Sequence, residues 1–112
     1  MNEFKGIVLY NIERDGNLNG VYTNNDSNGN ARIATETARL IDDSLVEGDT
    51  EVHIYDCFYF NNDEGINCTL TFRITNGIYR ADWQLNDGTP IFIGEGFQMN
   101  DRQIAISYWL AR

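Results

Sequence analysis

The stretch DGNLNGVYTNND, residues 15–26, follows the ligand pattern of a calcium-binding loop, with oxygen-bearing side chains at Asp15, Asn17, Asn19 and Asp26. Gly20 stands at the position of the sharp turn. The flanking segments have the composition of strands, whereas loops of this type lie between helices. Asp15-Gly16 is in addition a common hairpin turn. We therefore predict a β-hairpin with Arg14 opposite Asn17, and a cation site at the same loop is the alternative.

Two carboxylates, Asp56 and Glu95, are the candidates for acid–base chemistry. The strand registers predicted below direct both side chains into an apolar interior, where an unpaired charge is costly. Such acids can act as general acid and base or orient a polar ligand. In the competing interpretation, each acid is paired with a buried hydroxyl or water, lies at a rim, or is turned outward by a bulge.

The sequence contains no paired nucleophile and base. His53 and Cys57 lie in one apparent strand, and four residues of strand separate them by roughly 13 Å, too far for a hydrogen bond. We interpret His53 as a surface residue of that strand. The motifs of serine hydrolases, zinc proteases, paired redox cysteines and phosphate loops are absent from the sequence. We therefore expect no catalytic residues and no cofactor.

Large rings gather in the second half of the chain, in GIYRADWQL, IFIGEGF and RQIAISYWL. Gly94 and Gly96 lie among them, and their missing bulk leaves room beside the rings. This combination is typical of an aromatic-walled pocket, although close packing of a coiled sheet explains it as well. Together with the two acids, the predicted ligand-binding residues are Tyr79, Trp83, Phe92, Glu95, Trp109 and Asp56.

The elements that must position these residues are strands. Apolar runs rich in β-branched and aromatic residues alternate with Asn, Asp and Gly clusters at spacings of roughly 10 to 14 residues. Only residues 31–43 also fit a short helix, since Ile33, Thr37 and Leu40 lie near one helical face; we favour a strand there. No linker or repeat divides the 112 residues, so we expect a single domain over residues 1–112.

The turn Asn76-Gly77 defines the clearest pairing, because a type I′ turn needs positive φ at both central residues. Thr75 then lies opposite Ile78. One face of this hairpin is apolar and is expected to be buried: Cys68, Leu70, Phe72, Ile74, Tyr79, Ala81, Trp83 and Leu85.

Extending this face across the loop NNDEG places Phe58 opposite Cys68 and directs Asp56 inward. Cys57 then belongs to the other face, so we predict two free thiols and no disulfide.

The turn Asn100-Asp101 predicts that Phe97 pairs with Ile104, which directs Glu95 inward. The segment 86–90, NDGTP, leaves two registers open. The register that we favour, a five-residue loop, continues the core through Ile91, Ile93, Glu95 and Phe97. A tighter turn at Asp87-Gly88 would instead place Trp83 beside Phe92 and Tyr79 beside Gly96.

Seven or eight sequential strands expose two sheet edges unless the first and last strands meet, and closure removes both edges. We therefore predict an all-β antiparallel up-and-down meander that closes into a small barrel of about eight strands. A flattened β-sandwich is the alternative. Eight strands leave an interior that side chains or one small ligand can fill.

Three strand motifs of the second half, G-x-Y-x-x-x-W, G-x-G-[FL] and L-A-x-S-[YW], resemble a group of short bacterial proteins of uncharacterised function. The matching residues here are Tyr79, Trp83, Gly94, Gly96, Phe97, Ile104, Ala105, Ser107, Tyr108 and Trp109. The same strands are more distantly similar to avidin and lipocalin-type barrels, whose Trp-bearing strands line a ligand cavity. That resemblance implies an eight-stranded barrel with a pocket. It does not imply biotin, because the polar residues that hold a ureido group have no counterparts here.

The charge balance limits the partners. Eight basic against seventeen acidic side chains give a formal charge of -9, and no basic cluster offsets the repulsion from nucleic acid or anionic lipid. The first residues are too short for a membrane span and lack the features of a signal peptide, so we expect a cytoplasmic protein, or a secreted or periplasmic one if a leader has been removed.

The sequence favours a non-enzymatic barrel that binds a small, partly apolar ligand. One alternative is an enzyme that uses the inward carboxylates. The other is an oligomeric or scaffold module that associates through the last strands.

Overall fold

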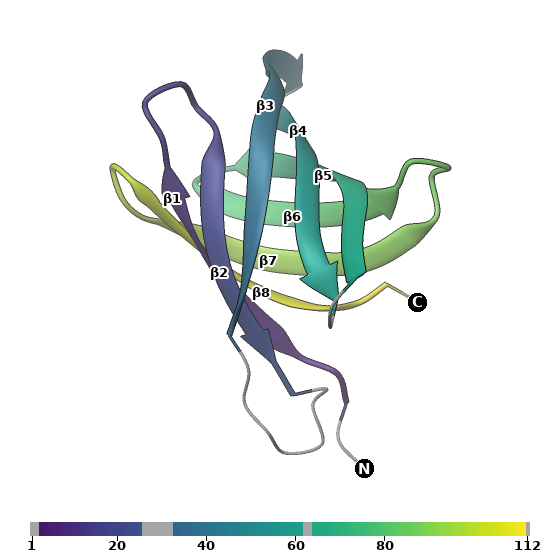
Figure 1. Ribbon diagram of the computed structural model, residues 1–112. Helices are drawn as coiled ribbons and strands as arrows, with labels where there is room; N and C mark the ends of the chain where they lie inside the picture. The colour runs from purple at the N-terminus through teal and green to yellow at the C-terminus, as the bar shows by residue number, and fades with distance from the viewer. Residues whose placement is uncertain (1–2, 26–32, 62–63, 112) are drawn as a thin grey trace.

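The computed structural model describes residues 3–25, 33–61 and 64–111. It contains eight strands: β1 Gly6–Ile12, β2 Leu18–Asn24, β3 Ala34–Glu47, β4 Thr50–Asn61, β5 Glu64–Thr75, β6 Ile78–Leu85, β7 Pro90–Asn100 and β8 Gln103–Leu110. Each strand pairs with its sequence neighbour, and β1 pairs antiparallel with β8, so that the sheet closes (Figure 1). The predicted up-and-down barrel is confirmed, and residues 34–43 are strand, as favoured over a helix. The described residues hold no helix that is long and apolar enough to span a membrane.

The turn between β5 and β6 has the predicted geometry. Asn76 and Gly77 have φ angles of 52° and 78°, both in the left-handed region that a type I′ turn requires. Thr75 lies opposite Ile78, and the remaining pairs follow the predicted register to Cys68 and Leu85. The face predicted to be buried is the face that points into the barrel.

Two other hairpins end in a turn closed by a glycine. In the β1–β2 turn, Gly16 (φ 88°) donates to the carbonyl of Glu13, and Asn17 lies opposite Glu13. The hairpin is confirmed, but the predicted pairing of Arg14 with Asn17 is wrong by one residue, because the glycine adds a bulge position. Gly88 (φ 90°) plays the same part between β6 and β7.

The register across residues 86–90 is the tighter of the two alternatives. Trp83 pairs with Phe92 and Tyr79 with Gly96. The favoured five-residue loop was wrong, because Leu85 and Thr89 are already hydrogen-bonded and leave only three residues in the turn.

The prediction that Asp56 points inward is wrong. Pairing of β4 with β5 extends to Asn61 and Glu64, so that Cys57, not Phe58, lies opposite Cys68. A shift of one residue exchanges the two faces of a strand. Both cysteines are consequently buried on the inner face, and both are free thiols as predicted.

The prediction that Glu95 points inward is wrong for a related reason. A register shift between Gln98 and Asn100 places Phe97 opposite Ala105 rather than Ile104. This bulge exchanges the faces of β7, so that Gly94 and Gly96 face the interior and Glu95 is exposed.

The glycines on β7 are needed for close packing. A Cβ on Gly94 would lie 2.6 Å from Ile106 and 3.2 Å from the ring of Trp83, and a Cβ on Gly96 would collide with the carbonyl of Ala105. The room beside the rings that the sequence suggested is therefore occupied by neighbours from β6 and β8.

Candidate functional site

A single buried carboxylate lies at the centre of the barrel. Glu36 on β3 is 6% exposed and is the one buried charged residue among those that the structure describes. Its Oε2 accepts hydrogen bonds from the Tyr10 hydroxyl, from the Cys57 thiol at 3.0 Å and from the Trp83 indole N–H at 3.1 Å. The donors come from β1, β4 and β6, so that the carboxylate links strands on different sides of the barrel.

Side chains along β3 point alternately into and out of the barrel, which explains why Glu36 is inside. Glu36 and Ala38 point inward, whereas Thr35, Thr37 and Arg39 are exposed. The small alanine leaves space around the carboxylate for the larger donors.

Burial sets the protonation of this cluster. Loss of solvation raises the pKa of Glu36, and the three hydrogen bonds act in the opposite direction. Burial, followed by the negative charge of Glu36, raises the pKa of Tyr10 well above its usual value, so its hydroxyl stays protonated and donates. Contact with Cys68, then burial and the charge of Glu36, raises the pKa of the Cys57 thiol. Cys57 is therefore not a reactive thiolate at neutral pH.

Rings fill the barrel on both sides of Glu36, and they differ in exposure. At one end Phe72 is fully buried and contacts Tyr10, Tyr55 and Tyr79 edge to face, with ring centroids 5.3 to 5.9 Å apart. All four of these rings are buried, and we call this end of the barrel the closed end.

The other end of the barrel, where β1 begins and β8 ends, carries a second cluster of rings. We call it the aromatic end, and its members are Phe4, Tyr22, Tyr59, Trp83, Phe92 and Tyr108. Phe92 contacts Phe4, Tyr59, Trp83 and Tyr108 at centroid distances of 5.4 to 6.2 Å. Phe4, Tyr22 and Phe92 remain partly exposed, unlike the rings of the closed end.

The aromatic end lies within the electrostatic reach of Glu36. Burial raises the pKa of Tyr22 to about 12, and the charge of Glu36 is the next contributor. Burial also raises the pKa of Tyr108 to about 12, with a smaller contribution from Glu36. Trp83 belongs to the cluster and bonds Glu36 directly. The arrangement is an apolar, ring-lined surface above a buried acid.

The predicted ligand-binding residues divide into two groups. Tyr79, Trp83 and Phe92 point inward, and Trp83 and Phe92 belong to the aromatic end. Asp56, Glu95 and Trp109 lie on the outer surface. The hypothesis of an enzyme that uses two inward carboxylates therefore loses its structural basis.

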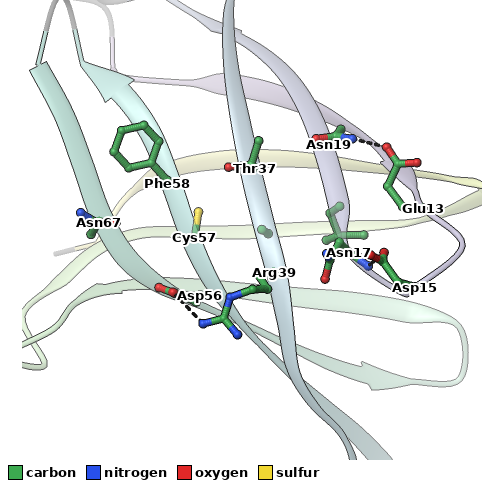
Figure 2. Close-up of a pocket in the computed structure, with 12 residues that line it drawn as sticks. Glu13, Asp15, Asn17, Asn19, Thr37, Arg39, Asp56, Cys57, Phe58 and Asn67 are labelled. Atoms are coloured by element: carbon green, nitrogen blue, oxygen red, sulfur yellow. Dashed lines mark hydrogen bonds and ion pairs between the residues drawn. The ribbon is translucent and has the colours of Figure 1, made fainter.

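The outer surface carries a polar groove of about 340 Å³ across β2, β3 and β4. Figure 2 shows Asp15, Asn17 and Asn19 on one side of it and Asp56 on the other. Their polar groups already bond within the chain: Asp15 accepts from Asn17, Asn19 donates to Glu13, and Asp56 pairs with Arg39 at 3.1 Å. The groove is thus a surface whose groups satisfy one another.

The predicted cation loop has the form of a hairpin turn. Asn17 Oδ1 accepts from the backbone N–H of Leu40 at 2.8 Å, which ties the turn to β3. Asp26 lies outside the described residues. Within the described part of the chain, no three His, Cys, Asp or Glu side chains are grouped so that they could hold a metal ion.

Sequence reasoning missed Glu36 and Tyr10. A signal for Glu36 was present: once residues 34–40 are taken as a strand, Ala34, Glu36, Ala38 and Leu40 share a face, and Arg39 marks the opposite one. An acid between small residues on the inner face is the pattern that would have identified it.

The chain matches no family model, and no curated protein or solved structure matches it either.

Proposed function

We propose that this protein is a non-enzymatic barrel that binds a small, partly apolar ligand at its aromatic end. The observation that carries this proposal is the difference between the two ends. The rings around Phe72 are all buried, whereas Phe4, Tyr22 and Phe92 are partly exposed, and Phe92 contacts the buried Trp83. Concave sites lined by rings with few polar groups are typical of small-molecule binding.

The tryptophans provide the test. Trp83 is 3% exposed and contacts Phe92, whereas Trp109 is 39% exposed on the outer face. The Trp109→Phe variant therefore leaves Trp83 as the only tryptophan, whose emission is excited selectively over that of the six tyrosines. In a titration with neutral phenethyl alcohol, the emission of Trp83 is expected to change and then to level off as the binding site is filled.

A pair of phenylalanine variants controls this test. In the same background, Phe92→Ala is expected to weaken binding, because Phe92 contacts four rings of the aromatic end. Phe97→Ala changes an outward-facing ring on the same strand, 55% exposed, and is expected to leave binding unchanged. A linear emission response, or equal effects of the two variants, would overturn the proposal.

A second candidate function, self-association through the last strands, is favoured by an exposed apolar strip. Ile78 pairs with Phe97, and Ile93 with Trp109, on the outer face of β6, β7 and β8. These side chains are 38 to 55% exposed, and exposed apolar patches commonly mark interfaces. Sedimentation equilibrium is expected to detect a dimer that Phe97→Lys dissociates. A monomer at all concentrations would exclude this candidate.

A further inference from the structure

Among the residues that the structure describes, Glu36 is a buried acid without a basic partner. The ion pairs of the described residues join Arg39 to Asp56, Arg73 to Glu47 and Asp82, and His53 to Glu51. No basic side chain in the described ranges reaches Glu36. A buried carboxylate is costly unless charge or hydrogen bonds compensate it, and here only neutral donors do so.

The two oxygens of this carboxylate differ. Oε2 accepts all three hydrogen bonds, and Oε1 accepts none from the described residues. No fully buried side-chain oxygen or nitrogen in the described part of the chain lacks a partner, so Oε1 is not completely covered by its neighbours. Glu36 thus presents one saturated oxygen and one open oxygen.

The rings of the aromatic end suit a cation. Trp83, Tyr22 and Tyr108 belong to the aromatic end, and ring faces attract alkylammonium groups. The negative charge of Glu36 reaches the hydroxyls of Tyr22 and Tyr108. The chain as a whole carries a formal charge of -9, which attracts cations and repels anions.

We propose that the ligand of the aromatic end is an amine, whose ammonium group pairs with Glu36 Oε1 while its apolar part contacts Phe92 and Tyr22. This inference rests on the proposed function and adds the charge of the ligand. The three donors fix Oε2, so the carboxylate is held in place before the amine binds. Such preorganisation lowers the cost of binding.

Three probes of similar size separate this inference from the proposed function. Phenethylamine is cationic, phenethyl alcohol neutral and phenylacetate anionic at neutral pH, and each is titrated against the Trp83 emission of the Trp109→Phe variant. The amine is expected to bind at least about tenfold more tightly than the alcohol, as a hydrogen bond between charged groups predicts. Phenylacetate is expected to bind most weakly. If the alcohol binds as tightly as the amine, the charge inference fails and the proposed function stands; if no probe binds, both fail.

Two variants, each with a carboxylate replaced by a carboxamide, test whether the charge of Glu36 causes the preference for the amine. Glu36→Gln keeps an oxygen acceptor for Tyr10, Cys57 and Trp83 but removes the negative charge, so the preference for the amine is expected to fall to within about threefold. Glu95→Gln makes the same change in net charge on the outer face, and the preference is expected to persist. Equal loss in both variants, or a preference that survives Glu36→Gln, would show that general attraction by the protein rather than Glu36 selects the cation.

Discussion

Trp83 on β6 donates its indole N–H to Glu36 on β3 over 3.1 Å, which joins two strands that are not neighbours in the sheet. The same indole packs against Phe92 and Tyr108. One side chain therefore connects the buried acid to the rings of the aromatic end.

Removal of this donor is expected to destabilise the fold. Trp83→Phe keeps a ring but deletes the N–H, and loss of a hydrogen bond to a charged group costs about 1.5–3 kcal/mol. Urea unfolding measures the difference. The matched control is Trp109→Phe on the outer face, which is expected to change the free energy of unfolding by no more than about 0.5 kcal/mol. Equal effects at the two positions would contradict the placement of Trp83.

The stability of the protein is expected to depend on pH through Glu36. Burial raises the pKa of this carboxyl in the folded state, so the folded protein binds its proton more tightly than the unfolded chain does. The stability that this group contributes is present below the pKa of the unfolded chain and is lost as pH rises through the pKa of the folded state. Tyr10 and Cys57, whose pKa values are also raised, keep their protons throughout this range.

Glu36→Gln removes this dependence, because the amide does not titrate. The difference in unfolding free energy, variant minus wild type, is expected to increase as pH rises above the pKa of a glutamate in the unfolded chain, because the folded wild-type protein holds this proton more tightly. Urea titrations at a series of pH values measure it, and groups common to both proteins cancel. A difference that stays constant with pH would mean that Glu36 does not titrate with a raised pKa.

The two cysteines are expected to resist alkylation in the folded protein. Cys57 and Cys68 are 1% and 0% exposed and lie opposite each other, and the raised pKa of Cys57 lowers its thiolate fraction further. Iodoacetamide is expected to alkylate both thiols rapidly in denaturant and to alkylate both much more slowly in the native protein. Mass spectrometry measures the extent of alkylation. Rapid stoichiometric labelling of the native protein would contradict the inner position of this pair.

The close approach of β7 and β8 is expected to make Gly96 intolerant of a side chain. A Cβ there would meet the backbone of Ala105, so Gly96→Ala is expected to cost at least about 1–3 kcal/mol, as other overpacked sites do. A Cβ at Gly65 would meet the side chain of Phe58, which is 36% exposed, rather than backbone, so Gly65→Ala is expected to cost less. Thermal unfolding compares the two variants, and the reverse order would contradict the register of β7.

The number and order of strands could be predicted because turn residues separate every apolar run. Asn76-Gly77 even specifies its register, since few other residues adopt positive φ at both central positions. Strand faces were harder to predict where both faces are apolar. One face of β4 carries Tyr55, Cys57 and Tyr59, and the other carries Phe58 and Phe60, so hydrophobicity alone does not identify the inner face. The register of β4 with β5, which pairs Asn61 with Glu64, places the first face inside.

The errors in the predicted site residues came from the errors in the predicted strand faces. Because a bulge in β7 is invisible in the alternation of its sequence, Glu95 was placed inside, and Asp56 was misplaced by one residue of register. Trp83 was identified from its ring and its strand, but its hydrogen-bond partner lies 47 residues away along the chain, beyond the reach of any local pattern.

A crystal structure of the Trp109→Phe protein soaked with phenethylamine tests the central claim most directly. The account predicts that the ammonium lies within hydrogen-bond distance of Glu36 Oε1 and that the phenyl ring contacts Phe92 and Tyr22. Phenethylamine bound instead in the outer groove beside Asp56, or an aromatic end that stays free of it at saturating concentration, would contradict the account.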